Sequence, residues 1–377
     1  MAYTPGLKVK RLVIVRKTRR LPLKGTVLVE KGDIVSQDSI IARTELPGDP
    51  ELMNMALKLG VNPNDKADSI VNYMYKKEGD SVKEGEIIAG YSQFFGLFKK
   101  SIPSPVSGVI ELISALSGQV IMRGDPIPVE VSAYIPGTIS NILPGEGATI
   151  DCPAAFIQGI FGLGGENHGE ILVFLNNPSA EDVTADCAEK ILVIKRVPET
   201  AVINKAIAVG VKGLVCGGIE AKTVIQLMGQ EIGVAITGHE DLGLTIVVTE
   251  GFGKMEMSEK TFGLFKEFEG KRASINGATQ IRAGVMRPEI IIPQETKGQQ
   301  LSMYDVEDTA VLSQGLQIGT PVRIIRGPYF GQLGSVSALP PALQFIATDS
   351  RVRVLETELE DGRKILIPRA NVEIIGE

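Results

Sequence analysis

The chain contains two histidines, and both stand beside carboxylates in glycine-rich stretches. His168 lies in FGLGGENHGEI, and His239 lies in AITGHEDLGLT, where Glu240 follows it directly. A histidine next to a carboxylate can act as a general base or bind a metal ion. These three residues are the candidates for catalysis, and both stretches are expected to form loops. The alternative is a polar turn in which each histidine only satisfies backbone groups.

The known catalytic and metal-binding motifs are missing from the sequence. It has no HExxH motif, no Cys/His ligand spacing and no Ser/His/Asp motif, and nothing in it brings the two histidines together. We therefore expect no metal and no cofactor. An enzyme, or a protein that binds a small ligand near His239, is kept as an alternative function.

Two glycine-rich loops are the candidates for ligand contact. CGGIEAK contains Gly217 and Gly218, and TEGFGKMEMSE contains Gly251 and Gly253. Each loop follows an expected strand and precedes an expected helix, where glycine lets the backbone approach a ligand and the helix N-terminus favours anions. Neither loop matches the glycine motifs that bind phosphate, and the second leads into acidic residues that repel it.

A third candidate site is the stretch RIIRGPYFGQLGSV at 323–336. Its Gly-Pro pair and later glycines predict a tight turn between two strands. The turn carries cationic, aromatic and amide side chains that suit a partner or RNA. These candidates are Arg323, Arg326, Tyr329, Phe330 and Gln332.

With the preceding residues, the stretch reads GTPVRIIRGPYFGQLGSV and resembles the KOW motif of the transcription elongation factor NusG and of several ribosomal proteins. Two further strands are expected at 351–359 and 365–375, joined by a hairpin turn at 360–364. The resemblance implies an SH3-like β-barrel that works beside RNA, RNA polymerase or the ribosome.

The charge of this segment favours a protein partner instead. From Gly319 onward, seven basic residues balance seven acidic ones. A module that binds by neutralising phosphates is expected to be basic. RNA contact, protein contact and a purely structural barrel therefore all remain open.

The middle of the chain alternates between strand and helix patterns, which predicts a largely parallel sheet covered by helices. The expected strands are 191–196, 212–218, 244–253 and 271–275. The expected helices are 198–210, 219–229 and 257–270, the last with Ser258 as its N-cap.

The first 150 residues contain an internal repeat. LVEKGDIVSQDSIIAR (28–43) matches YKKEGDSVKEGEIIAG (75–90), and a second similar pair covers 104–124 and 133–152. The repeat resembles the biotinyl/lipoyl barrel-sandwich hybrid, a β fold made of two similar halves. The hairpin lysine that carries biotin or lipoate in that family is missing, so neither cofactor is expected.

The segment KVKRLVIVRKTRR (8–20) has seven basic residues out of thirteen around an apolar core. One interpretation is a strand that touches phosphate. The other is a buried strand whose charged ends are covered by acidic residues elsewhere in the chain.

Composition sets further limits. The net charge is −6, tryptophan is absent, and the three cysteines are far apart without a CxxC pair. A disulfide framework is not expected, and no apolar run approaches the length of a membrane span. These features indicate a cytoplasmic protein that does not enter a membrane.

The predicted fold class is α+β multidomain, with three domains. They are a barrel-sandwich-like β domain (1–155), an α/β domain (156–300), and a linker with a KOW barrel (301–377). The leading functional hypothesis is a non-catalytic binding or scaffold protein that contacts the transcription or translation machinery or RNA. The second is a self-assembling structural homo-oligomer.

Overall fold

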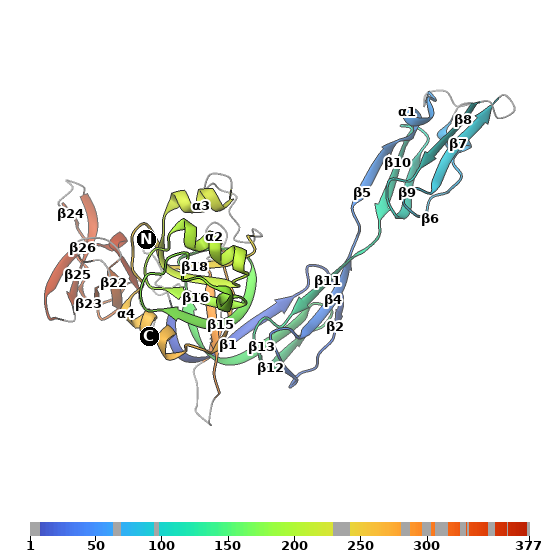
Figure 1. Cartoon of the computed structure of the whole chain (residues 1–377). Coiled ribbons are helices and arrows are strands. Elements are labelled where there is room, and N and C mark those ends of the chain that lie inside the picture. The colour runs from blue at the N-terminus through green and yellow to red at the C-terminus, as the bar shows by residue number, and fades with distance from the viewer. Residues whose placement is uncertain are drawn as a thin grey trace.

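Figure 1 shows an elongated molecule with a long β arm, a central body that carries the longer helices, and a small C-terminal β domain. The computed structural model describes residues 8–62, 69–93, 98–228, 242–279, 287–295, 303–305, 316–324, 329, 332–345, 351–359 and 361–374. Most of these residues lie in strands that form several separate sheets. The prediction of a β-rich protein with several parts is therefore confirmed.

The body is built on a 12-stranded sheet whose central strands are parallel. These strands lie in the order β18-β17-β16-β15. Their bounds are β15 Glu166–Phe174, β16 Lys190–Ile194, β17 Gly213–Ile219 and β18 Thr245–Phe252. Strands β16, β17 and β18 are almost entirely buried, as expected for strands with helices on both faces.

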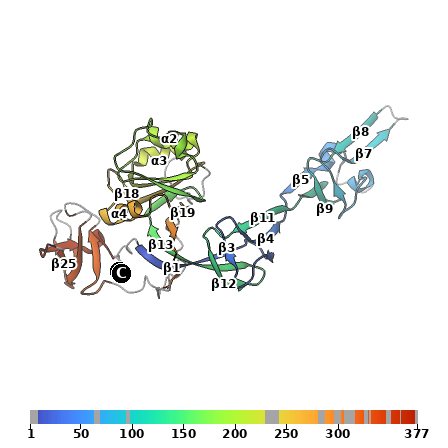
Figure 2. The ribbon, with the colours of Figure 1, turned by 60° about the horizontal axis from the view of Figure 1, so that its bottom comes forward.

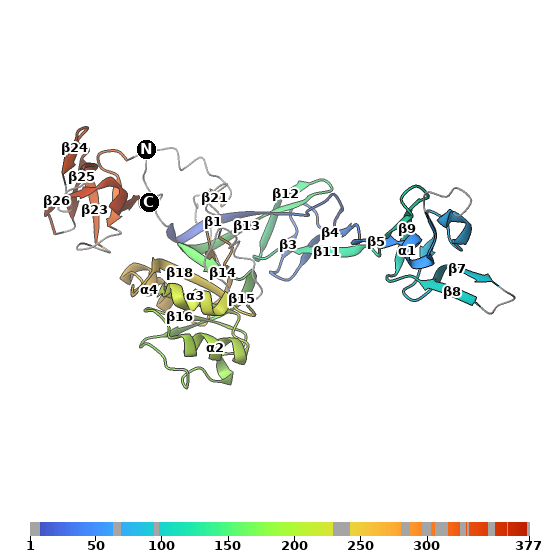
Figure 3. The same cartoon turned by 90° about the horizontal axis from the view of Figure 1, so that it is seen from above.

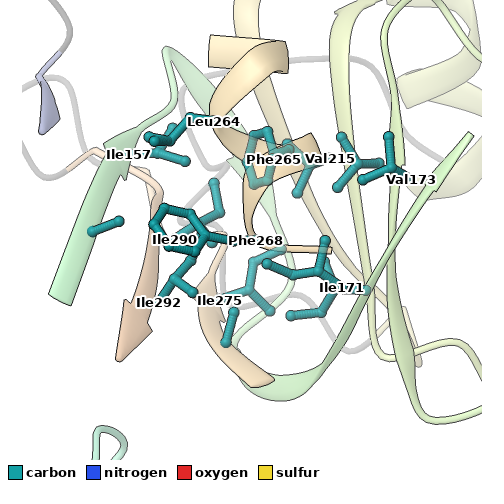
Figure 4. Packing of buried hydrophobic residues seen from close by; sticks show 14 of the residues in the cluster. Ile157, Ile171, Val173, Val215, Leu264, Phe265, Phe268, Ile275, Ile290 and Ile292 are labelled. Atoms are coloured by element: carbon teal, nitrogen blue, oxygen red, sulfur yellow. The ribbon is translucent and has the colours of Figure 1, made fainter. Parts of the chain in front are cut away.

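Helices α2 (Thr200–Val209) and α3 (Ala221–Met228) cover one face of this sheet, and α4 (Glu259–Glu267) covers the other (Figure 2). On the α4 face, Phe265 packs with Val215 and Ile275 in a continuous apolar cluster (Figure 4). The two faces of the sheet therefore pack against separate apolar cores, and the sheet lies between these cores.

The sequence located these elements well. Each strand and helix predicted between 191 and 275 overlaps an observed element. Ser258 is the N-cap of α4, where its hydroxyl accepts a hydrogen bond from the backbone N–H of Thr261. However, β19 (Arg272–Asn276) runs antiparallel to its neighbour β15, so the run of parallel strands in the middle of the chain ends at β15.

Two long strands join the body to the arm. Strands β1 (Val9–Arg20) and β13 (Gly147–Gln158) pair antiparallel along their length and run from one part into the other (Figure 3). Strand β13 also pairs with β20 (Glu289–Pro293) in the body and with β12 (Gly137–Leu143) in the arm. The predicted boundary after residue 155 therefore falls inside a strand that both parts share.

The arm consists of two units in series, here called the inner and the outer unit. The inner unit contains β2 Thr26–Val27, β3 Ile34–Val35, β4 Ile40–Leu46, β11 Ile127–Ser132 and β12. The outer unit contains β5 Pro50–Asn54, α1 Met55–Leu59, β6 Ser81–Val82, β7 Ile87–Gln93, β8 Phe98–Pro103, β9 Gly108–Ser114 and β10 Gln119–Gly124. The two units have separate apolar cores, and the core of the inner unit continues along β1 and β13 as far as Ile291 of β20.

The two copies of the sequence repeat make equivalent hydrogen bonds. In the inner unit the Asp33 carboxylate accepts from the backbone N–H of Glu30 at 2.8 Å, and in the outer unit Asp80 accepts from Lys77 at 2.7 Å. Strand β3 pairs with β12 just as β6 pairs with β9. The matching sequence phrases therefore form the same turn and the same strand pairing twice.

The outer unit is inserted into the inner unit. The chain leaves the inner unit after β4 and returns to it at β11, so residues 48–124 form an excursion. The two ends of the excursion touch, because the backbone N–H of Gly124 donates to the Asp49 carbonyl at 3.0 Å. Gly48 also lies so close to Gly124 that a Cβ on Gly48 would be 2.2 Å from the Gly124 carbonyl oxygen.

The C-terminal domain (316–374) is a six-stranded sheet in the order β24-β25-β23-β22-β27, with β26 beside β25. The strands are β22 Pro321–Ile324, β23 Leu333–Ala338, β24 Leu343–Phe345, β25 Arg351–Leu359, β26 Lys364–Pro368 and β27 Val372–Ile374. They enclose a small apolar core of their own. None of the described helices is long and apolar enough to cross a membrane.

Candidate functional site

The basic N-terminal segment forms β1, and several of its cations pair with carboxylates of the same chain. Val13 and Val15 are buried on one face of the strand. Four of its cations form ion pairs with carboxylates that come from distant parts of the sequence. The pairs are Arg11–Glu267, Arg16–Asp151, Lys17–Glu289 and Arg19–Glu166. These pairs favour the interpretation of a strand whose charges are covered by acidic residues from elsewhere in the chain.

His168 does not lie in a loop, as the sequence analysis expected, but inside β15. The residues that follow it in β15 alternate between buried and more exposed positions. In the antiparallel pairing with β19, His168 lies directly opposite Ser274. Its Nε2 lies 3.3 Å from a carboxylate oxygen of Asp38 in the arm, and its side chain is 32% exposed. The residue therefore links body and arm. His239 and Glu240 lie outside the described residues.

No described group of three or more His, Cys, Asp or Glu side chains is arranged to hold a metal ion. All three cysteines are buried and free. Burial raises the pKa of both Cys152 and Cys216 to about 12, so neither thiol is poised as a nucleophile at neutral pH.

The turn between β22 and β23 carries the predicted contact residues, and its first cation points inward. Arg323 pairs with Glu250 of β18 at 2.8 Å, and the side chains are only 12% and 4% exposed. Tyr329 is partly buried against the core of the C-terminal domain, whereas Gln332 is exposed. Arg326 and Phe330 lie outside the described residues. The motif therefore supplies an internal contact between domain and body.

A different part of the C-terminal domain presents aromatic and basic side chains to solvent. Leu343 of β24 is directly opposite Arg353 of β25, and Phe345 is opposite Arg351. Opposite residues in an antiparallel pair, and residues two apart on one strand, share a face. These four side chains therefore form one surface, here called the β24–β25 face.

The β24–β25 face is open. Phe345 is 72% exposed and Leu343 is 48% exposed. The guanidinium carbon of Arg351 lies 5.7 Å from the centre of the Phe345 ring, a cation–π contact. Both Arg351 and Arg353 are exposed. Residues 343–353, which span the paired part of the two strands and the residues that join them, contain one acid, Asp349, and so have a net charge of +1.

The other described cations of this domain are already engaged. Arg363 pairs with Asp361, and Lys364 lies near two glutamates of β25. Arg369 donates to the backbone carbonyls of Val354 and Pro340. Arg323 is likewise engaged, in its buried pair with Glu250. Among the described cations of the domain, Arg351 and Arg353 on the β24–β25 face are therefore the ones open to a partner.

The four glycines predicted to lie in loops come together at the carboxyl ends of β17 and β18, but Gly217 and Gly218 lie inside β17 and Gly251 lies inside β18, so that Gly253 alone follows its strand. A Cβ on Gly217 would lie 2.3 Å from the Met257 backbone nitrogen, and one on Gly218 would lie 2.4 Å from the Gly253 carbonyl oxygen. The glycines therefore allow the segment after β18 to cross tightly over the end of β17. Gly251 and Gly253 have φ angles of +129° and +101°, which glycine adopts without strain.

These two loops and the segments that follow β15 and β16 border a pocket of about 540 Å³. The glycines themselves do not line it, and the sequence analysis named none of the side chains that do. They are Asn177, Arg196, Val197, Pro198, Glu199, Thr200, Glu220, Lys222, Thr223, Lys254, Met255 and Glu256.

No protein-family model matches this chain, and no curated protein matches it significantly in sequence.

Proposed function

We propose that the protein is a non-catalytic binding protein that contacts single-stranded RNA through the β24–β25 face of its C-terminal domain. The observation that carries the proposal is the exposed Phe345 ring on the same face as Arg351 and Arg353. A flat aromatic ring beside cations is the combination that binds single strands, because bases stack on the ring and phosphates pair with the cations.

The charge balance fits a compact contact rather than a broad electrostatic surface. The domain has equal numbers of basic and acidic residues, and half of its described cations are in ion pairs. We therefore expect few phosphate contacts and a shallow dependence of affinity on salt. The likeness of residues 319–336 to the KOW motif supports an RNA context for this domain.

The test is fluorescence anisotropy of a labelled oligouridine RNA titrated with the full chain at several KCl concentrations. Phe345→Ala is expected to weaken binding roughly 5- to 150-fold, which corresponds to about 1–3 kcal/mol for one stacked base. Arg353→Gln is expected to lower the salt slope by about 0.7, the share of one phosphate on a single strand. Arg363→Gln is the control, because its partner Asp361 already neutralises it.

RNA binding that Phe345→Ala leaves unchanged would overturn the proposal. Failure to bind RNA at low salt would also overturn it. Capture of a protein from lysate that persists after nuclease treatment and is lost in Phe345→Ala would show that the same face binds protein instead.

A further inference from the structure

The pocket in the body lies at a switch point of the sheet. Strands β17 and β18 are parallel neighbours, yet the chain leaves them in opposite directions. After β17 it enters α3, which packs in the cluster on one face, and after β18 it enters α4, which packs on the other. Ligands of open α/β sheets bind outside the carboxyl ends of the strands at such a point.

The pocket is made by the connections that follow all four parallel strands. Asn177 follows β15, Arg196 follows β16, Glu220 follows β17 and Lys254 follows β18. Its volume of about 540 Å³ lies within the usual range of small-molecule sites. The position and the volume of the pocket both suit a ligand the size of a nucleotide or a sugar phosphate.

Most charges around the pocket form pairs with one another. Lys222 lies 2.6 Å from Glu220, and Arg196 lies 2.8 Å from Glu256. Lys222, and to a smaller extent Lys254, lower the pKa of Glu220, so this carboxylate is charged at neutral pH. The charges within each of these two pairs cancel. Two other charged side chains that line the pocket are outside these pairs.

These two groups have opposite signs. Lys254 and Glu199 are exposed at the pocket, and neither has an ion-pair partner within the described part of the chain. The hydroxyls of Thr200 and Thr223 lie 3.1 Å apart in the first turns of α2 and α3. The lining thus offers one cation, one carboxylate and a pair of hydroxyls to a ligand.

We infer that this pocket binds a phosphate ester of a hydroxylated molecule, with the phosphate at Lys254 and the hydroxyls of the ligand at Glu199. A lysine ammonium pairs with phosphate as a point charge, and a carboxylate accepts hydrogen bonds from sugar hydroxyls. The hydroxyls of Thr200 and Thr223 add hydrogen-bonding groups to the lining. The site is in a different part of the chain from the β24–β25 face.

The experiment is isothermal titration calorimetry of the full chain with inorganic phosphate, ribose 5-phosphate and ADP. Ribose and adenosine are the unphosphorylated counterparts. We expect the phosphorylated probes to bind and the counterparts to show no measurable heat. Lys254→Gln is expected to weaken binding about tenfold or more, the usual effect of removing a charge-assisted hydrogen bond.

Lys260→Gln is the matched control, because Lys260 is an exposed lysine of α4 outside the pocket. Glu199→Gln is expected to weaken ribose 5-phosphate and ADP while inorganic phosphate binds as before. Phe345→Ala is expected to bind all probes normally, which separates this site from the RNA face. The inference is wrong if no phosphorylated probe binds, or if Lys254→Gln binds them as tightly as the unmodified chain.

Discussion

Arg323 of the C-terminal domain and Glu250 of the central sheet form a salt bridge of 2.8 Å that is almost closed to solvent. The other carboxylate oxygen of Glu250 accepts from the backbone N–H of Ser258 at 3.1 Å. Ser258 ends the segment that carries Lys254 and Met255 along the pocket. One carboxylate therefore holds both the neighbouring domain and a wall of the pocket.

Removing this carboxylate is expected to loosen both contacts. Glu250→Gln leaves the Arg323 charge largely buried without its partner charge, which we expect to cost about 3 kcal/mol, the low end for a buried pair. Hydrogen exchange measured by mass spectrometry should rise at Ser258, whose amide loses a charged acceptor. Arg363→Gln, which breaks the exposed pair with Asp361, is the control and should leave exchange at Ser258 unchanged. Equal exchange in Glu250→Gln and the unmodified chain would contradict this role.

The tight crossing over β17 predicts a strong effect of one methyl group. In Gly217→Ala the new Cβ would meet the Met257 nitrogen at 2.3 Å and the Lys195 carbonyl oxygen at 2.5 Å. Because both are backbone atoms, the loop has to move, and we expect a loss of about 1–3 kcal/mol in urea unfolding. Gly165→Ala is the matched control, since nothing lies within 4 Å of its added Cβ. Similar midpoints for both variants would show that the crossing tolerates the methyl group.

Stability is expected to fall at alkaline pH. Burial raises the pKa of the Cys152 and Cys216 thiols from 9.0 to about 12, and it also raises the pKa of Tyr134 well above 10.0. Above pH 9 the unfolded chain releases thiol protons that the folded chain keeps, so the unfolded state gains stability. The loss is about 1 kcal/mol per thiol for each pH unit between 9 and 12.

Urea unfolding at pH 8, 9 and about 10.5 measures this loss. The free energy of unfolding should be flat from pH 8 to 9 and should then decline. The double variant Cys152→Ala, Cys216→Ala should decline less steeply above pH 9. A native chain whose thiols react rapidly with a thiol reagent at pH 8 would contradict the buried, neutral state of these cysteines.

The outer unit of the arm is expected to fold without the rest of the chain. Its core, which includes Met55, Ile88 and Met122, is a cluster separate from that of the inner unit. A peptide of residues 49–124 should therefore unfold cooperatively by circular dichroism. The remaining chain, closed by a short Gly-Ser linker in place of 49–123, should keep its own transition. Deletion of 137–143 is the control, because β12 pairs with β3 of the inner unit and with β13, and its loss should unfold that unit.

The sequence predicted local structure where a strong local pattern was present. Runs such as ILVIKR and the helix that starts at Ser258 have clear periodicity or caps, and the structure contains those elements. The Gly-Asp turns at Asp33 and Asp80 were also visible, because the same side-chain hydrogen bond requires the same residues. His168 was misplaced, because glycines beside it suggested a loop although they allow close strand packing: a Cβ on Gly169 would lie 2.5 Å from the Glu189 carbonyl oxygen.

The sites were less accessible to sequence reasoning because they depend on which strands are neighbours. The alternation in LQF and RVR predicts two faces but does not say that the face with Phe345 is the open one. Arg323 was predicted to be a contact residue, and only the docking of the domain places it against Glu250. Lys254 became a pocket residue because α3 and α4 cover opposite faces of the sheet, a relationship between segments far apart in the chain.

The insertion of one arm unit into the other has a consequence for synthesis of the chain. The inner unit is discontinuous, since β4 has to wait for β11, which lies some eighty residues downstream, whereas the outer unit is continuous. A unit that emerges complete from the ribosome is able to fold before one that is still missing a strand. Folding of the outer unit first brings Gly48 against Gly124, so the long loop that the inner unit has to close becomes a short one and its entropic cost falls. The folded outer unit thus holds β4 and β11 of the inner unit close together, so that these two strands can pair during translation.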